Sequence, residues 1–122
     1  MVDLDRLERV LIQAALESRP VTYGQVLGYF GWKVTRVTVS ALCRDLGRIE
    51  ARHREEGWPD LACLVVRKSD GLPGEGYFGS LRAEAAYAGP SVGPAAATLI
   101  KARQALAHAW AMGRTDSTLP KP

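Results

Sequence analysis

The chain has 122 residues, of which 47% are hydrophobic and 24% charged, values that are ordinary for a globular protein with one modest core. No apolar run approaches the roughly 18 residues of a membrane helix, and the first residues lack the pattern of a signal peptide. We therefore expect a cytoplasmic protein with no membrane partner. Cys43 and Cys63 lie in apolar surroundings and form no disulfide framework, which fits a reducing compartment.

The net charge of +3 is concentrated in one segment. Residues 33–54 hold six basic and two acidic side chains, whereas the stretches before and after them are close to neutral. A basic segment of this kind attracts polyanions, above all nucleic acid, but the same pattern also suits a protein partner or a solvated helix face. The charge distribution therefore places the expected binding surface in this segment.

Two helices are predicted before this segment, at residues 4–17 and 23–30. Apolar residues recur at helical spacing in the first helix, and Asp3 is placed to cap its start. Thr22 to Gln25 has the S/T-x-x-E/Q form of a capping box, which predicts the start of the second helix.

A third helix, predicted at residues 36–54, has a basic side and an apolar side. At about 100° per residue, five polar positions advance by i+4 steps over roughly 160°, namely Arg36, Ser40, Arg44, Arg48 and Arg52. The opposite arc holds Val39, Leu42, Cys43, Leu46, Ile49 and His53. Thr35 or Thr38 caps this helix. Because a tight connection through residues 31–33 joins it to the preceding helix, the sequence predicts a helix-turn-helix motif.

Residues 61–67 form the clearest predicted strand, and their nearly continuous apolar run indicates that both faces are covered. A turn is predicted at residues 68–71. The next segment has two interpretations: the return strand of a hairpin that includes Tyr77 and Phe78, or an irregular loop packed down by these aromatic residues. A hairpin after a helix-turn-helix is the position of the wing in a winged-helix domain.

The last third of the chain predicts a short helix at residues 80–88, capped by Ser80, and a longer helix at 94–112 that begins with Pro94 and ends at Gly113. One side of the longer helix gathers Leu99, Ala102, Leu106, Ala109 and Trp110. Residues 114–122 are predicted to be disordered. The expected organisation is a winged-helix-like domain over residues 1–88, a linker at 89–94, and a helix at 94–112 that packs on this domain or forms a dimer.

No catalytic or metal centre is predicted. Cys43, Cys63, His53 and His108 form none of the close C-x-x-C or H-x-x-x-H pairs that metal sites use. Apolar neighbours around Cys63 lower the reactivity of its thiol. The glycines of residues 71–76 are not followed by the Lys-Ser/Thr of a phosphate-binding loop, so they favour a tight turn. We expect a protein without enzyme activity, metal or cofactor.

Val21-Thr-Tyr-Gly-Gln-Val26 resembles the helix opening in the DNA-binding domain of O6-alkylguanine-DNA alkyltransferases and alkyltransferase-like proteins. In that family an apolar strand and a glycine-bearing turn follow the helix-turn-helix, and the segments 21–54, 61–67 and 69–78 have the same order. The family's Pro-Cys-His-Arg centre is replaced here by Ala62-Cys63-Leu64-Val65, so the resemblance implies the architecture and not alkyl transfer. Residues 64–78 also resemble a motif in small uncharacterised proteins of prophages and other mobile elements.

These observations predict a mainly α fold with a small β-hairpin, a winged helix-turn-helix with an added C-terminal helix. The leading hypothesis is non-catalytic, regulatory binding of double-stranded DNA by a monomer or homodimer. The expected contact residues are Lys33, Arg36, Ser40, Arg44, Arg48, Arg52, Arg67 and Lys68. The alternative is a small phage-encoded or mobile-element-encoded inhibitor or adaptor, for example an anti-CRISPR that blocks a CRISPR-Cas complex, which binds a bacterial protein through the same helix. Trp32 and Trp58 are expected in the core or in such an interface.

Overall fold

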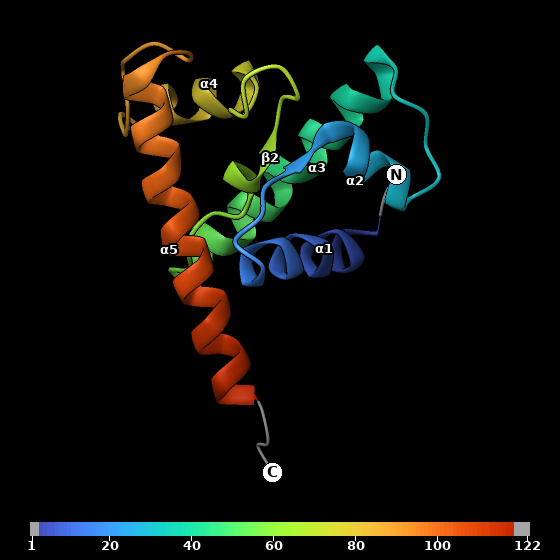
Figure 1. The fold of residues 1–122 in the computed structure, drawn as a ribbon, viewed down its shortest axis with the longest axis vertical. Helices are drawn as coiled ribbons and strands as arrows, with labels where there is room; N and C mark the ends of the chain where they lie inside the picture. Colours follow the sequence, from blue (N-terminus) through green and yellow to red (C-terminus); the bar gives the residue numbers. More distant parts are fainter. Residues whose placement is uncertain (1–2, 119–122) are drawn as a thin grey trace.

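The structure of this chain, a computed structural model, describes the backbone of residues 3–118 and the side chains of residues 3–113. The elements are α1 Leu4–Leu16, β1 Val21–Thr22, α2 Tyr23–Tyr29, α3 Arg36–Glu56, the 3₁₀ helix η1 Ala62–Leu64, β2 Val65–Val66, α4 Glu75–Ala83 and α5 Pro94–Thr118 (Figure 1). The prediction of a mainly helical fold is confirmed. No helix in the described part of the chain is long and apolar enough to span a membrane.

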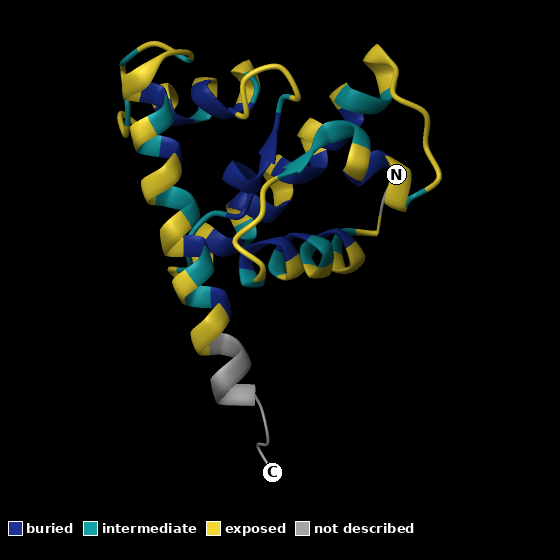
Figure 2. Cartoon of the chain, viewed as in Figure 1, coloured by how far each residue is buried: buried dark blue, intermediate teal, exposed yellow. Residues whose placement is uncertain are grey.

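The core lies where η1 contacts α1, α3 and α5. Helix α5 runs along one side of the molecule and contacts α1, while the N-terminal end of α3 lies on the side away from α5 (Figure 1). Figure 2 shows that the buried residues gather at the centre of this arrangement and that the N-terminal end of α3 is largely exposed. Helix α3 therefore has one end anchored in the core and one end that projects from it.

The predicted starts of α1, α2 and α3 are confirmed, and each start depends on a cap formed by residues close together in the sequence. The Asp3 side chain accepts hydrogen bonds from two backbone N–H groups at the start of α1, and reciprocal capping boxes open the next two helices. In α2 the pair is Thr22 and Gln25, and in α3 it is Thr35 and Thr38. Local hydrogen bonds thus determine where all three helices begin.

The predicted wing is wrong among the described residues. The only strand in the predicted stretch 61–67 is β2, and it pairs in parallel with β1, Val21 opposite Val65 and Thr22 opposite Val66. The two strands are joined by the helices α2 and α3, and such a crossover returns the chain in the same direction. The residues just before β2 form η1 instead of strand, because the Asp60 carboxylate accepts a hydrogen bond from the backbone N–H of Cys63 at 3.1 Å.

Tyr77 and Phe78 belong to α4, so neither the return strand nor the loop interpretation holds. The helix begins at Glu75, ahead of the predicted start at Ser80, and it buries Tyr77, Phe78 and Leu81 on one face. Its N-cap is Gly74, whose backbone N–H donates to the Tyr23 hydroxyl at 2.9 Å. A contact with Tyr23 of α2, which lies 51 residues earlier in the chain, therefore fixes where α4 starts.

Helix α5 begins at Pro94 as predicted, but its buried face and its end differ from the prediction. The residues buried against the rest of the protein are Ala96, Ile100, Ala107 and Ala111, whereas Leu106 is 61% exposed. The small alanines allow the α5 backbone to lie close to α1, which favours this face over the one with the larger side chains. Gly113 does not end the helix, which continues to Thr118 through part of the predicted disordered tail; residues 119–122 lie outside the described residues.

Candidate nucleic-acid interface

The connection between α2 and α3 is held in one conformation by local hydrogen bonds. Gly31 has a φ of 72°, a left-handed conformation that glycine adopts without strain. The backbone N–H of Trp32 then donates to the Leu27 carbonyl at 3.0 Å, and the Thr38 hydroxyl donates to the Lys33 carbonyl at 2.6 Å. Residues 31–35 are all exposed, so the connection presents a defined surface to solvent (Figure 2).

The exposed cations at the start of α3, together with Ser40, form what we call the basic end: Lys33, Arg36, Ser40 and Arg44. Arg36, Ser40 and Arg44 follow one another at i+4 and therefore share a helix face. Among the described residues, no carboxylate forms an ion pair with Lys33, Arg36 or Arg44. The basic end therefore carries positive charge that the described part of the fold does not neutralise.

The arginines in the second half of α3 have partners within the chain. Arg52 Nη1 lies 3.2 Å from carboxylate oxygens of both Asp5 and Glu8 on α1. Arg54 pairs with Glu84 after α4, and Arg48, which is still 59% exposed, pairs with Asp45 at 3.4 Å. The arginines of α3 thus fall into two groups. Arg36 and Arg44 face solvent, and among the described residues Arg48 pairs only within the helix. Arg52 and Arg54 hold α3 against neighbouring elements.

Arg67 and Lys68 also have different environments. The Arg67 guanidinium forms two hydrogen bonds to Asp70, at 3.1 and 2.9 Å, and a third to the Ser91 carbonyl, and its hydrogen bond lowers the pKa of Asp70. Lys68 is exposed and forms no ion pair with a described residue. Both line an open groove of about 700 Å³ together with Val34. The structure therefore brings the 67–71 turn beside the connection that leads into the basic end.

Exposed apolar side chains lie among the cations, and the sequence interpretation considered only Trp32 among them as an interface residue. Val37 is 75% exposed, Val34 63% and Trp32 39%. The position of Val37 outside the apolar arc of α3 was an available signal, since an apolar residue there has no core to pack against. Trp58, by contrast, is half-buried and its ring packs against His53 and Trp110.

The burial of three residues on α3 can be compared with the sequence pattern: one prediction is wrong, one is confirmed, and one buried residue was not predicted. Cys43 is exposed, although its helical angle placed it on the apolar arc. It lies at the edge of that arc, where the face turns towards solvent. Asp45 is only 3% exposed, and its Oδ2 has no hydrogen-bond partner among the described residues. His53 is fully buried as predicted, with Nδ1 2.8 Å from the Pro59 carbonyl and Nε2 2.5 Å from Glu8.

A second polar cluster lies between α3, α4 and α5, where the sequence interpretation found no pairing of acids. Asp60 accepts hydrogen bonds from the Tyr77 hydroxyl at 2.5 Å and from Arg103 at 3.1 Å. Burial, followed by the nearby charge of Asp60, raises the pKa values of Tyr77 and Cys63. Both groups therefore stay protonated at neutral pH, and neither supplies a ready nucleophile.

Glu50 lies at the edge of the same cluster, in a cleft of about 280 Å³. Burial raises its pKa to about 7, with further contributions from the charges of Asp60 and Glu84. Across the described residues, no group of three or more His, Cys, Asp and Glu side chains is arranged to hold a metal ion. Through Asp60, hydrogen bonds and an ion pair join α4 and α5 to the segment that connects α3 with η1.

Comparison of the chain with protein-family models, with curated proteins and with solved structures finds no match. The function is therefore argued from the residues and their geometry.

Proposed function

We propose that this protein binds double-stranded DNA without catalysis, through the basic end of α3. The observation that supports this most strongly is the division of the arginines. Arg52 and Arg54 form ion pairs within the chain, whereas Arg36 and Arg44 on the projecting half have no carboxylate partner among the described residues. Cations that a fold leaves unpaired on a projecting helix suit the phosphate groups and base edges of a duplex.

The contact residues have separate roles in this proposal. Arg36, Ser40 and Arg44 face a groove of the duplex, since an α-helix fits the major groove and arginine pairs with guanine there. Lys33, Arg48 and Lys68 contact phosphates on either side. Arg52 and Arg67 hold the fold through Asp5, Glu8 and Asp70, so they support the surface without contacting DNA. The order helix, turn, helix, strand and glycine-bearing turn is also that of the alkyltransferase DNA-binding domain that residues 21–26 resemble.

The test is a mobility-shift titration with random duplex DNA at several salt concentrations. The double variant Arg36→Ala/Arg44→Ala is expected to weaken binding at least tenfold at low salt. Each contact to a phosphate, as proposed for Lys33 and Lys68, contributes about 0.9 to the slope of log affinity against log salt. Arg82→Ala/Lys101→Ala removes two exposed cations from α4 and α5 and is the matched control. No binding at low salt, or equal losses in the two double variants, contradicts the proposal.

A protein partner is the second candidate function, and the exposed apolar residues favour it. Val34, Val37 and Trp32 surround the cations, and protein interfaces combine apolar and aromatic anchors with arginine in this way. A phage-encoded or mobile-element-encoded antagonist of a bacterial defence complex would use such a surface. A pull-down from nuclease-treated bacterial lysate distinguishes the two candidate functions. A protein partner that is retained by the wild type and lost with Val37→Ser favours binding to a protein.

Dimerisation through α5 would present two basic ends to a palindromic DNA site. The outer face of α5 carries the exposed Leu106, which no described element covers. Light scattering measures the mass in solution. A monomer at all concentrations would contradict binding of a dimer to a palindromic DNA site.

A further inference from the structure

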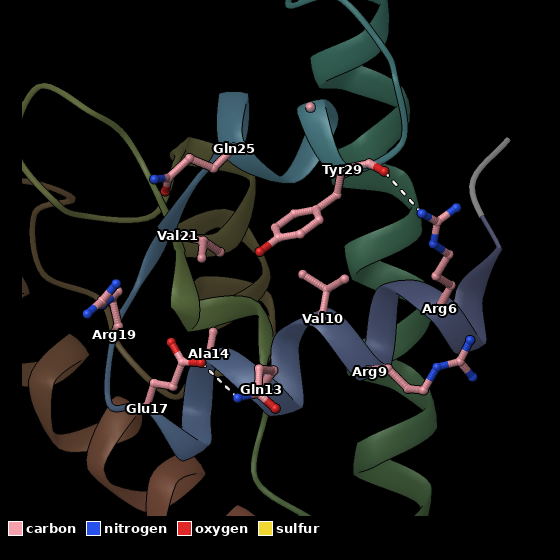
Figure 3. A pocket seen from close by; sticks show the side chains of 11 residues that line it. Arg6, Arg9, Val10, Gln13, Ala14, Glu17, Arg19, Val21, Gln25 and Tyr29 are labelled. Carbon is pink, nitrogen blue, oxygen red and sulfur yellow. Dashed lines mark hydrogen bonds between the residues drawn. The ribbon is translucent and has the colours of Figure 1, made fainter.

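A hollow on the described surface lies between α1 and α2, and none of the cations of the basic end lines it. It is an open groove of about 760 Å³. Val10 and Ala14 from α1, Val21 from β1 and the ring of Tyr29 from α2 form its apolar lining. Val10 and Tyr29 face each other across the groove (Figure 3). The Tyr29 side chain is 61% exposed, so a large aromatic surface is available to a ligand.

Three arginines surround this apolar lining. Figure 3 shows Arg6 at one end of the groove and Arg19 at the other, while the Arg9 side chain extends from α1 on the Arg6 side, away from Val10 and Tyr29. Among the described residues, none of the three forms an ion pair. Glu17 is the only acid in the lining, and its carboxylate accepts a hydrogen bond from Gln13 at 2.7 Å. The groove therefore combines an apolar centre with positively charged ends.

Arg6 is held in place, which prepares one end of the groove for an anion. Its guanidinium donates to the Tyr29 carbonyl at 3.2 Å and lies 4.9 Å from the centre of the Phe30 ring. Both contacts leave donors of the five-donor guanidinium fork for another acceptor. A guanidinium that is already oriented loses less conformational entropy when it binds a carboxylate.

We infer that this groove binds an acidic peptide segment of a partner protein. Glutamate or aspartate side chains at its ends pair with Arg6, Arg9 and Arg19, and an apolar side chain in its centre packs on Val10 and Tyr29. The rise of α1 from Arg6 to its last residue, Leu16, spans about 15 Å, which matches about five residues of extended chain or about ten residues of helix. The apolar centre favours a peptide over a DNA duplex, since the bases of a duplex are stacked inside it and leave no apolar group to place there.

The probe is a fluorescein-labelled peptide with glutamates at both ends and a Leu-Trp-Leu centre, titrated with the full chain and followed by fluorescence anisotropy. Two control peptides separate the contributions. One carries lysines in place of the glutamates, and the other carries serines in place of the apolar centre. Both are expected to bind at least about tenfold more weakly, since charge and apolar contact each contribute.

Variants of the chain locate the binding site. Arg9→Glu/Arg19→Glu is expected to weaken the acidic peptide at least about tenfold at low salt and less at high salt. Tyr29→Ala is expected to weaken it about fivefold at both salt concentrations, because apolar contact is not screened. Arg82→Glu/Lys101→Glu makes the same charge change on α4 and α5 and is the matched control.

Three results overturn the inference. The first is equal peptide affinity in the Arg9→Glu/Arg19→Glu variant and its matched control. The second is undiminished binding of the serine-centred peptide, which leaves only non-specific attraction between opposite charges. The third is that Arg9→Glu/Arg19→Glu loses more duplex DNA binding than its matched control while its peptide binding is unchanged. That result would assign the groove to the nucleic-acid surface.

Discussion

Glu50 offers the most quantitative test of the structure, through the substitution Glu50→Gln. The side chain is 10% exposed, and its closest cation is Arg54, at 3.9 Å, which also pairs with Glu84. Burial, together with the charges of Asp60 and Glu84, raises the pKa of Glu50 from 4.5 to about 7. Glutamine has nearly the same shape and carries no charge, so the variant removes the titration while keeping the packing.

The sign follows from proton binding in the two states. The folded state binds the Glu50 proton more tightly than the unfolded state, so the free energy of unfolding falls as pH rises from about 4.5 to about 7. A tenfold change in proton affinity corresponds to about 1.4 kcal/mol, which sets an upper limit of about 3 kcal/mol for this shift. Because solvent reaches the carboxylate through the cleft, we expect about 1–2 kcal/mol.

The assay is urea denaturation of wild type and Glu50→Gln at about pH 5 and pH 8. At the higher pH the variant is expected to be more stable by about 1–2 kcal/mol, and the two proteins are expected to be nearly equal at the lower pH. Taking the difference between them cancels the other groups that titrate. Glu55→Gln makes the same change at an exposed position of α3, and it should alter stability by less than about 0.5 kcal/mol at either pH.

A stability difference between wild type and Glu50→Gln that is the same at both pH values would refute this reasoning. That result shows that Glu50 is ionised in the folded state throughout the range, and therefore that Arg54 or solvent stabilises its charge. A Glu50→Gln variant that is less stable than wild type at the higher pH would also refute it, because ionised Glu50 would then stabilise the fold.

Three further outcomes are expected. Gly57→Ala should lower the free energy of unfolding by about 1 kcal/mol, because Gly57 ends α3 with a φ of 73°. Gly47→Ala, within the same helix, should raise it by about 0.5–1 kcal/mol. Both sites have open space for a Cβ, so effects of opposite sign in thermal denaturation are expected from the backbone conformation alone. Tyr23→Phe removes the acceptor for the Gly74 N–H and should lower Tm by about 4 °C; an unchanged Tm contradicts this contact. Asp45→Asn removes the charge beside Arg48 and should strengthen DNA binding about two- to threefold in the mobility-shift assay, and weaker binding argues against a contact in this region.

Helix starts were predictable because their cause is local. Each of the first three helices begins at a cap whose donor and acceptor lie within three residues, so the pattern can be read without knowing the fold. The identity of α3 as the basic helix was predictable for the same reason, since an i+4 spacing of arginines defines a face from sequence alone. The position of the candidate interface on that helix follows from these two features.

The separation of binding arginines from structural ones required the tertiary structure. Arg36 and Arg52 belong to the same i+4 series in the sequence, but the acids that pair with Arg52 lie 44 and 47 residues away in the chain. Spacing within one helix carries no information about which neighbouring element supplies a carboxylate. The groove between α1 and α2 was missed for the same reason, because its walls come from separate segments.

The second half of the fold depended on contacts that the sequence does not specify locally. A buried apolar run such as Leu61–Val66 suits a strand or a 3₁₀ turn equally well. The hydrogen bond from Cys63 N–H to Asp60 and the pairing of β2 with β1 decided between them. Alanine-rich α5 has little difference between its faces, so close packing against α1 selected the buried one. The sequence by itself determined the local hydrogen bonds and the location of the positive charge. Tertiary packing decided which strands pair, which helix face is buried and which arginines lack an ion-pair partner, because these depend on groups that only folding brings together.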